Sequence, residues 1–273
     1  MALAPDLAAA VDAFAARGAP LLVATDFDGV LAPLVDDPAA SRATAAGQTA
    51  LDQLAAADGV TLALVSGRHL DALAEVSRAP AGTLLIGSHG AERGVVRSRS
   101  PRHSASQHLP DVARVPLDLS DAQRTALAAL IAGLEGSVAG VDGAWVEHKP
   151  SAAVLHTRLA APEDAAAVTE RALEIAAELD LAPMQGKDVV EVAVLETSKG
   201  KALAALRDEL GASAVFYMGD DVTDERAFEV LGDDDLTVKV GPGATAARFR
   251  VETPEDAAVV LAAIATAVGP AES

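Results

Sequence analysis

The chain has 273 residues, of which 51% are hydrophobic, and its 40 acidic and 21 basic residues give a net charge of −19. This apolar fraction supports a packed core and excludes a disordered chain, and the negative charge disfavours nucleic acid and anionic membranes as partners. Because the chain has no cysteine, disulfides, thiol catalysis and cysteine-ligated metals are excluded, and we expect a soluble, cytoplasmic protein.

The N-terminal segment Met1–Gly18 is apolar, but Asp6 and Asp12 interrupt it and it has no basic leader. We expect an amphipathic helix there and not a signal peptide. No uninterrupted apolar run reaches the length of a membrane-spanning helix, so no membrane segment is predicted.

Short apolar runs alternate with Ala/Leu-rich segments of helical period over most of the chain, and each run ends in polar, glycine-containing residues. This alternation predicts an α/β protein with a doubly wound parallel sheet, whose ligand site lies at the carboxyl ends of the strands. The expected strands are 21–25, 59–65, 83–86, 214–218 and 236–240, and the expected helices are 43–57, 70–76, 199–210 and 224–231.

The middle of the chain has a different pattern. Residues 93–116 combine arginines and prolines with little periodicity, as a linker would, and we interpret the basic stretch Arg93–His103 as solvated linker. A helix followed by two strands is then predicted twice, which indicates a small inserted α+β domain at 103–190 within a larger domain of 1–102 and 191–273. Its expected elements are helices 120–134 and 162–179 and strands 143–149, 152–159, 182–186 and 188–195.

Asp26-Phe27-Asp28-Gly29 follows the first expected strand. Two carboxylates at this spacing can face one pocket, where one attacks an electrophile while the other moves protons, or where both hold a hard cation. An acidic turn without a catalytic role has the same composition. A second acidic cluster, Gly219–Glu225, follows the strand 214–218, and its acids also suit the start of a helix.

Two further signals are weaker. Ser66-Gly67-Arg68 ends a strand, where the Ser66 hydroxyl and N–H could bind a phosphate oxygen, although such a turn is often only a turn. Lys199 opens an expected helix, where the helix dipole disfavours a positive charge. Either an anionic group lies near Lys199 or the lysine is exposed to solvent.

In chain order, these four motifs resemble those of the haloacid dehalogenase (HAD) superfamily of phosphohydrolases. Further strings extend the resemblance to the trehalose-6-phosphate phosphatases over about residues 20–260. The sequence departs from the family at Val30, where Thr is common and where a hydroxyl contact to phosphate would be lost. The matching strings are Gly87–Glu92, Val146–Lys149, His156–Arg158, Lys187 with Glu191, Ser198–Gly200 and Gly219–Glu225.

The resemblance implies a HAD-like, Rossmann-like core with an inserted cap domain and a Mg²⁺-dependent phosphatase acting on trehalose 6-phosphate. Asp26 would attack phosphorus to form an aspartyl-phosphate, and Asp28 would protonate the departing sugar oxygen and then activate water. Ser66 and Lys199 would hold the phosphoryl oxygens.

The resemblance also implies a metal site. Mg²⁺ would bind a carboxylate oxygen of Asp26, the backbone carbonyl of Asp28 and the side chain of Asp220. Asp221 and Asp224 would not bind the metal directly but would position the residues that do. A metal and one lysine would thus let a strongly acidic protein bind an anion.

The inserted domain would supply sugar specificity. If Pro150-Ser151 turns a hairpin, Glu147 and Lys149 share a sheet face with His156 and Arg158 on the partner strand. A solvated face with surface ion pairs is the alternative. Trp145, which could lie at the sugar face, and Tyr217 are interpreted as packing residues, and His148 should point away from that face. The substrate-binding residues that the resemblance implies are Arg68, Glu147, Lys149, Arg158, Lys187 and Glu191.

Alternatives remain open at this point. Another phosphatase of the same architecture could act on sucrose phosphate or a mannosyl- or glucosyl-phosphoglycerate, and a sugar phosphomutase uses the same aspartyl-phosphate. A catalytically silent sensor is disfavoured because Asp26 and Asp28 are both present. The expected partner is a small-molecule sugar phosphate, and the chain is expected to be a monomer.

Overall fold

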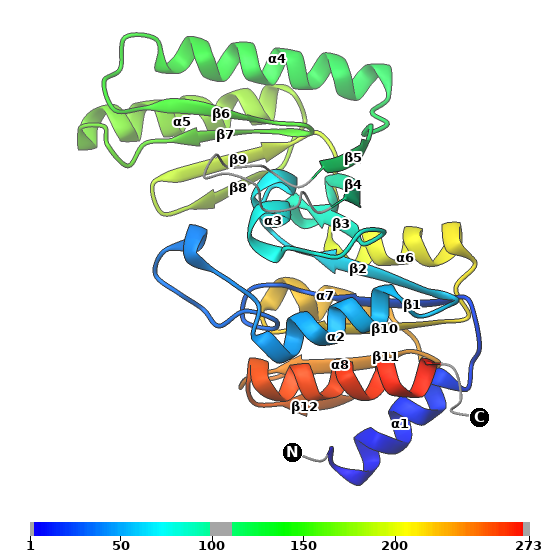
Figure 1. Ribbon diagram of the computed structural model, residues 1–273. Helices are drawn as coiled ribbons and strands as arrows, with labels where there is room; N and C mark the ends of the chain where they lie inside the picture. The colour runs from blue at the N-terminus through cyan, green and yellow to red at the C-terminus, as the bar shows by residue number, and fades with distance from the viewer. Residues whose placement is uncertain (1–2, 99–110, 270–273) are drawn as a thin grey trace. The chain divides into compact units, whose positions relative to one another are not determined.

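The structure is a computed structural model that describes residues 3–98 and 111–269. The chain divides into two compact units, Met1–Val115 with Thr197–Ser273 and Pro116–Glu196. Each unit has its own β-sheet (Figure 1). Each also has its own apolar core.

The larger unit is built on an eight-stranded sheet with the order β12-β11-β10-β1-β2-β3-β4-β5. The strands from β12 to β3 are parallel, and β4 and β5 pair antiparallel at one edge. This sheet confirms the predicted doubly wound α/β class. The strands are β1 (Leu21–Thr25), β2 (Val60–Val65), β3 (Leu84–Gly87), β4 (Glu92–Ser98), β5 (Asp111–Val115), β10 (Ala214–Gly219), β11 (Leu236–Val240) and β12 (Phe249–Val251).

Helices cover both faces of this sheet. In β1, Leu21 and Val23 pack into one apolar cluster with α1, α2, α3 and α8, whereas Leu22 and Ala24 pack into another with α6 and α7. Burial on both faces explains why the strand sequences are continuously apolar. The helices are α1 (Pro5–Ala15), α2 (Ala45–Ala55), α3 (Leu70–Ser77), α6 (Lys199–Leu210), α7 (Val222–Val230) and α8 (Pro254–Val268), with short 3₁₀ turns η1 (Pro38–Ala40) and η2 (Ser88–Gly90).

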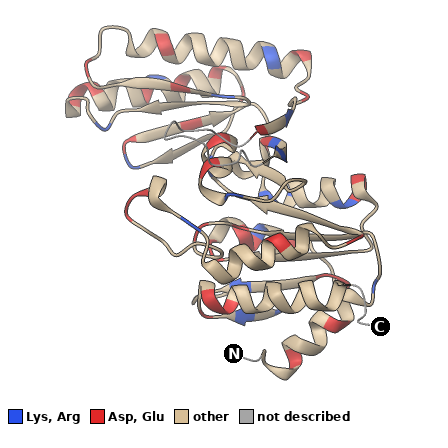
Figure 2. Cartoon of the chain, in the orientation of Figure 1, with Lys and Arg blue, Asp and Glu red and all other residues tan. Residues whose placement is uncertain are grey.

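The predicted N-terminal helix is α1, which buries Leu7, Val11 and Phe14 against the sheet. Across residues 3–98 and 111–269, none of the helices has the length and apolar character that crossing a bilayer requires. Figure 2 marks acidic residues on elements of both units, with fewer basic residues among them.

The prediction of a linker over 93–116 was wrong at both ends, where β4 and β5 pair antiparallel. Val96 is buried in the core and Val112 packs against it, so apolar residues between the arginines make these strands part of the sheet. Arg93 pairs with Glu209 and is therefore not a solvated linker residue. The remainder of the expected linker, residues 99–110, lies outside the described residues.

The smaller unit contains a four-stranded antiparallel sheet with the order β6-β7-β9-β8. Helices α4 and α5 pack on one face of it around Leu130, Leu155, Ile175 and Val190. The elements are α4 (Asp121–Val138), β6 (Trp145–Lys149), β7 (Ala152–His156), α5 (Pro162–Glu178), β8 (Pro183–Gly186) and β9 (Val189–Ala193).

This unit is the expected helix–strand–strand arrangement used twice, but its limits differ from 103–190. The chain passes into it after β5, because β5 belongs to the larger sheet, and leaves it after β9, because β9 is a central strand of the smaller sheet. A boundary at 190 would divide β9.

Candidate active site

The site lies where the larger sheet changes direction. Strands β1 and β10 are neighbours, and the chain runs from β1 toward β2 and β3 but from β10 toward β11 and β12 on the other side. Ligands of such sheets bind at this switch point, beyond the carboxyl ends of the strands. A cavity of about 380 Å³ lies there, lined by Asp26, Asp28, Leu34, Ser66, Gly67, Arg68, His89, Lys199, Asp220 and Asp221.

Lys199 is the first residue of α6 and is 2% exposed. Its Nζ donates to Asp26 Oδ2 at 2.6 Å and to Asp224 Oδ1 at 2.8 Å. Burial would lower the pKa of Lys199, but the charges of the two carboxylates outweigh it and hold that pKa above its ordinary value. Two anions therefore offset the unfavourable helix dipole, and the alternative of an exposed lysine is wrong.

Asp26, Asp220 and Asp224 form an acidic cluster in which one oxygen from each lies within 4.8 Å of the others. Burial raises the pKa of Asp26, the charge of Asp224 adds to this, and Lys199 opposes it. Burial likewise raises the pKa of Asp220 to about 6, with the charges of Asp224 and Asp221 contributing. Carboxylates that repel one another at this distance are the hard oxygen ligands that a divalent cation favours, so the donor set fits a metal.

Asp224 and Asp221 fix the turn that carries Asp220. The fully buried Asp224 accepts through Oδ2 from the backbone N–H groups of Asp220 and Asp221, at 2.9 and 3.0 Å. Asp221 caps α7 by accepting from the N–H groups of Thr223 and Asp224. Asp224 thus holds the backbone of Asp220 directly, whereas Asp221 fixes the start of the helix that carries Asp224.

Tyr217 was interpreted as a packing residue, and it is fully buried, but its hydroxyl also donates to Asp224 Oδ1 at 2.5 Å. Asp224 Oδ1 therefore accepts from Tyr217 and Lys199 together. A tyrosine in a fully buried strand needs a partner for its hydroxyl, and that signal could have linked it to the acidic cluster.

Arg68, expected to bind substrate, lies on Asp28 in this structure. Its Nε and one Nη donate to the two carboxylate oxygens at 2.5 and 2.7 Å, and Ser41 Oγ donates to Oδ1 at 2.8 Å. Burial would raise the pKa of Asp28, but these hydrogen bonds and the Arg68 charge outweigh it and hold that pKa below its ordinary value. Asp28 is thus held ionised, as a proton acceptor needs. No motif pointed to Ser41.

Ser66 directly follows β2 and is 2% exposed at the wall of the same cavity. Its Oγ accepts from the backbone N–H of Arg68 at 3.2 Å, which fixes the turn into α3. Val30 is fully buried in the apolar core, so a packing role accounts for it.

On the smaller unit, the residues expected at the sugar separate into two groups. Pro150-Ser151 turns the β6–β7 hairpin as predicted, and the register Glu147–Val154–Glu191 puts these residues on one sheet face with Lys149. Lys149 Nζ lies 2.8 Å from a Glu191 oxygen, and Glu147 lies 2.8 Å from His156 Nε2. The His156 ring stacks on Trp145 at 4.7 Å.

Arg158 and Lys187 are not on these strands. β7 ends at His156, so Arg158 lies in the exposed turn that follows, and Lys187 lies in the exposed turn between β8 and β9. The expectation that Arg158 shares a strand face with His156 was wrong, because β7 ends at His156 and the expected strand continued to residue 159. Lys187 was expected to share a strand face with Glu191, which was also wrong, because β8 ends at Gly186 and β9 begins at Val189. His148 points to the other face, as predicted, where it pairs with Glu135 of α4.

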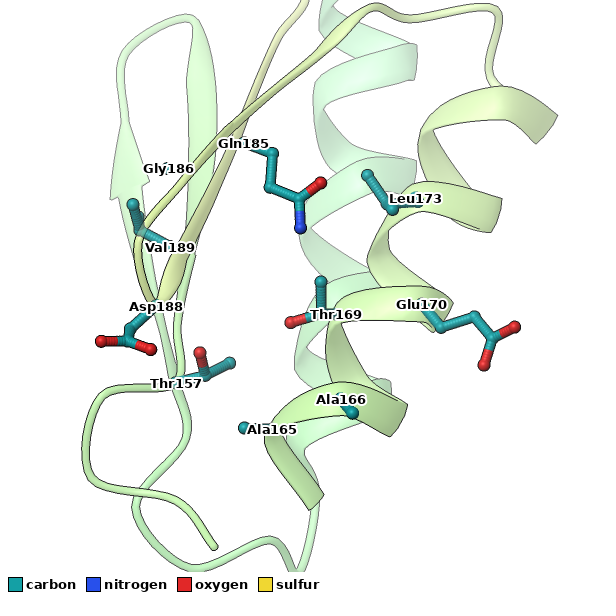
Figure 3. A pocket seen from close by; sticks show the side chains of 10 residues that line it. All are labelled: Thr157, Ala165, Ala166, Thr169, Glu170, Leu173, Gln185, Gly186, Asp188 and Val189. Atoms are coloured by element: carbon teal, nitrogen blue, oxygen red, sulfur yellow. The ribbon is translucent and has the colours of Figure 1, made fainter. Parts of the chain in front are cut away.

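A second cavity, of about 450 Å³, lies between α5 and the β8–β9 hairpin of the smaller unit (Figure 3). Its walls include the Gln185 amide and the hydroxyls of Thr157 and Thr169, whereas the carboxylates of Glu170 and Asp188 point away from the space between the helix and the hairpin (Figure 3). The ten described residues that line it include no lysine or arginine, so it is unsuited to a phosphate group. None of the expected site residues lines it.

Residues 24–255 match the sequence profile of the trehalose-phosphatase family. The chain belongs to this family. It is therefore a phosphatase that hydrolyses a phosphoric monoester, and its substrate is a sugar phosphate.

Two curated relatives illustrate the trehalose-phosphatase match. The chain is 36% identical over 252 residues to a trehalose-6-phosphate phosphatase of Escherichia coli, covering 89% of this chain and 86% of that protein. It is 34% identical over 247 residues to a trehalose-phosphate phosphatase of Mycobacterium marinum, covering 84% of this chain and only 57% of that longer protein.

Solved structures of the same family share the fold. A trehalose-6-phosphate phosphatase related protein aligns over 90% of this chain and 97% of its own, with a TM-score of 0.60 and 25% identity. The Aspergillus fumigatus trehalose-6-phosphate phosphatase aligns over 95% of this chain and 97% of its own, with a TM-score of 0.66 and 23% identity. The HAD-like core with an inserted α+β domain is thus confirmed.

Proposed function

We propose that the protein hydrolyses trehalose 6-phosphate to trehalose and phosphate, with Asp26 as the nucleophile and Mg²⁺ as the metal. The observation that carries the proposal is the buried contact of Lys199 with Asp26 at the carboxyl end of β1, beside Asp220. This contact supports a site in which a nucleophile and a cation bind the same phosphoryl group. The names of the relatives support the choice of sugar.

Asp26 attacks phosphorus in line, and the bond from phosphorus to the sugar oxygen breaks, leaving an aspartyl-phosphate. Asp28 delivers a proton to the departing oxygen and takes one from the water that hydrolyses the intermediate. For the first of these steps Asp28 must carry a proton, so its two bonds from Arg68 must loosen when substrate binds. Lys199 and Ser66 hold the phosphoryl oxygens.

Asp26 and Asp220, with the backbone carbonyl of Asp28, would hold Mg²⁺. When bound, the metal neutralises charge on the phosphoryl oxygens and on the clustered carboxylates. Asp224 would not be a direct ligand, because each of its oxygens already accepts two hydrogen bonds, Oδ1 from Lys199 and Tyr217 and Oδ2 from two backbone N–H groups, whereas each oxygen of Asp26 accepts one. Its part is to place Asp220.

Removing the metal should therefore remove activity. In excess chelator, we expect phosphate release from trehalose 6-phosphate to stop, and added Mg²⁺ should restore it. Asp220→Asn should raise the Mg²⁺ concentration needed for half-maximal activity or eliminate turnover, while Asp221→Asn should have a smaller effect. Full activity in excess chelator would exclude the metal assignment.

The proposed sugar-binding surface is the face of the smaller sheet that lies opposite α4 and α5. Glu147, Lys149 and Glu191 carry carboxylates that accept and an ammonium that donates, which suits hydroxyl groups. Trp145 is 38% exposed and lies flat on His156, so an apolar ring face is available beside them. Both kinds of contact are used by sites that bind neutral sugars.

Glu147→Gln tests this surface. It removes the charge that pairs with His156 but keeps the size of the side chain, and kcat/KM for trehalose 6-phosphate should fall by roughly 10- to 1,000-fold if one or two charge-assisted hydrogen bonds are lost. Hydrolysis of p-nitrophenyl phosphate, which has no sugar hydroxyls, should be nearly unchanged.

Glu135→Gln is the matched control, because Glu135 makes the equivalent pair with His148 on the opposite side of the smaller sheet. It should leave both substrates unaffected. If Glu147→Gln lowers kcat/KM equally for both substrates, Glu147 supports the structure and does not contact the sugar.

A further inference from the structure

The turn after β3 is conformationally strained. Ser88 and His89 both have positive φ values, of 47° and 54°, and Gly90 follows at 110°. Only glycine adopts such angles without cost, so two consecutive other residues there cost free energy. Strain of this kind persists where the surroundings hold it, and it is frequent at functional sites.

Hydrogen bonds on every side hold this turn. The Ser88 N–H donates to the Arg68 carbonyl at 2.7 Å, and the His89 N–H donates to the Ser66 carbonyl at 3.0 Å. Ser88 Oγ donates to the buried carboxylate of Glu92 at 2.7 Å. The turn is therefore fixed to the loop that carries Ser66 at the wall of the active-site cavity.

The His89 ring occupies a defined place in that cavity. A Cβ atom on Gly67 would lie 2.5 Å from His89 Cε1 and 2.7 Å from Nε2, so the ring fills the space that a side chain at position 67 would need. The ring lines the same cavity as Asp26, Ser66 and Lys199. Its side chain is nevertheless exposed, so burial in a core does not explain why histidine stands at a strained position.

The charge in the cavity indicates what this ring could do. Four carboxylates line the cavity against two cations, and in this structure Lys199 bonds Asp26 and Asp224 while Arg68 bonds Asp28. A phosphate monoester adds further negative charge. An imidazole N–H is a hydrogen-bond donor that can meet a phosphoryl oxygen, and His89 brings such a group to this anion-rich cavity.

We propose that His89 is a further catalytic residue of this phosphatase, and that its imidazole donates a hydrogen bond to an oxygen of the phosphoryl group. The inference rests on the proposed function of the cavity. This role would explain the strained backbone, because the strained turn places the ring over Gly67, on the side of the phosphoryl oxygens that Ser66 and Lys199 would also bind.

His89→Gly is the sharpest test, because it removes the ring and also relieves the backbone strain. We expect the melting temperature to stay the same or rise, while kcat/KM for trehalose 6-phosphate falls by roughly 10- to 100-fold, as for one lost charge-assisted hydrogen bond. The inhibition constant of inorganic phosphate should rise by a similar factor. Free imidazole should restore part of the activity with saturation.

Arg78→Gly is the matched control. Arg78 ends α3 with φ of 49°, is exposed and does not line the cavity, so this change relieves the same kind of strain elsewhere. It should leave turnover and phosphate inhibition at wild-type values. His89→Asn, which tolerates the left-handed conformation and keeps an N–H donor, should retain more activity than His89→Gly.

Two outcomes overturn the proposal. Wild-type kcat/KM in a folded His89→Gly variant would show that the ring does not contact substrate. Lower activity with unchanged phosphate inhibition and no imidazole rescue would make His89 a structural residue. The inhibition by inorganic phosphate, measured with p-nitrophenyl phosphate as the reporter, tests His89 separately from trehalose 6-phosphate, whose turnover by the wild type decides the proposed function.

Discussion

Replacing Asp26 by Asn should abolish phosphate release from trehalose 6-phosphate, with a fall in kcat of roughly 10⁴-fold or more, as expected for a lost nucleophile. An amide is nearly the same size as a carboxylate but is a poor nucleophile. Asp26 is 5% exposed and lies against Lys199, so its carboxylate is held in place at the carboxyl end of β1. Steady-state assays on the purified variant measure the loss.

The control for Asp26→Asn is Asp28→Asn, which should also be severely impaired but should still accept the phosphoryl group in a single turnover of a substrate with a good leaving group. Acid-quenched protein from labelled p-nitrophenyl phosphate should then carry phosphate in Asp28→Asn and none in Asp26→Asn. Activity of Asp26→Asn within about tenfold of wild type would refute the covalent role.

Replacing Lys199 by Met should damage both catalysis and stability. Lys199 is the buried partner of Asp26 and Asp224, and its removal leaves two carboxylates without their cation. Breaking a buried ion pair from one side costs about 3–5 kcal/mol, so the free energy of unfolding should fall by about that amount. Urea unfolding measures it, and kcat should fall by at least about 10²-fold, as for other lost electrostatic stabilisers.

The double variant Lys199→Met, Asp224→Asn separates these two effects. Neutralising Asp224 removes one of the uncompensated buried charges, so part of the lost stability should return. Activity should not return, because nothing then replaces the ammonium beside the phosphoryl group. A single Lys199→Met variant of wild-type stability would contradict the buried ion-pair account.

The position of the site could be predicted from the sequence because of how parallel sheets are built. Asp26, Ser66 and Asp220 each follow a strand, and the carboxyl ends of parallel strands meet at one edge. The period of the apolar residues located these strands. Lys199 was singled out by its unfavourable place at a helix start, which left either a nearby anion or exposure to solvent as the explanation.

The supporting contacts could not be predicted in this way. Ser41 donates to Asp28 from a position 13 residues further along the chain, and no sequence pattern in that loop predicts this contact. Arg68 was expected on the substrate, but its pairing with Asp28 depends on the distance between two loops, which no spacing along the chain gives. Tyr217 carried a usable signal, since its hydroxyl needed a partner.

Strand ends were also hard to fix. Arg158 lies in a turn because β7 stops at His156, whereas the sequence pattern extended that strand to residue 159. The segment around β4 and β5 was mistaken for a linker because its arginines and prolines hide the few apolar residues, such as Val96, that join it to the core. Edge strands need fewer apolar residues than central ones, which makes them look like loops.

The most direct measurement is the products formed from trehalose 6-phosphate by the purified protein with Mg²⁺, compared with a panel of other sugar monophosphates. The account predicts equal amounts of free trehalose and inorganic phosphate, and a kcat/KM for trehalose 6-phosphate well above that for glucose 6-phosphate or sucrose phosphate. Transfer of phosphate to another sugar hydroxyl without phosphate release, or a clear preference for a different sugar phosphate, would contradict it.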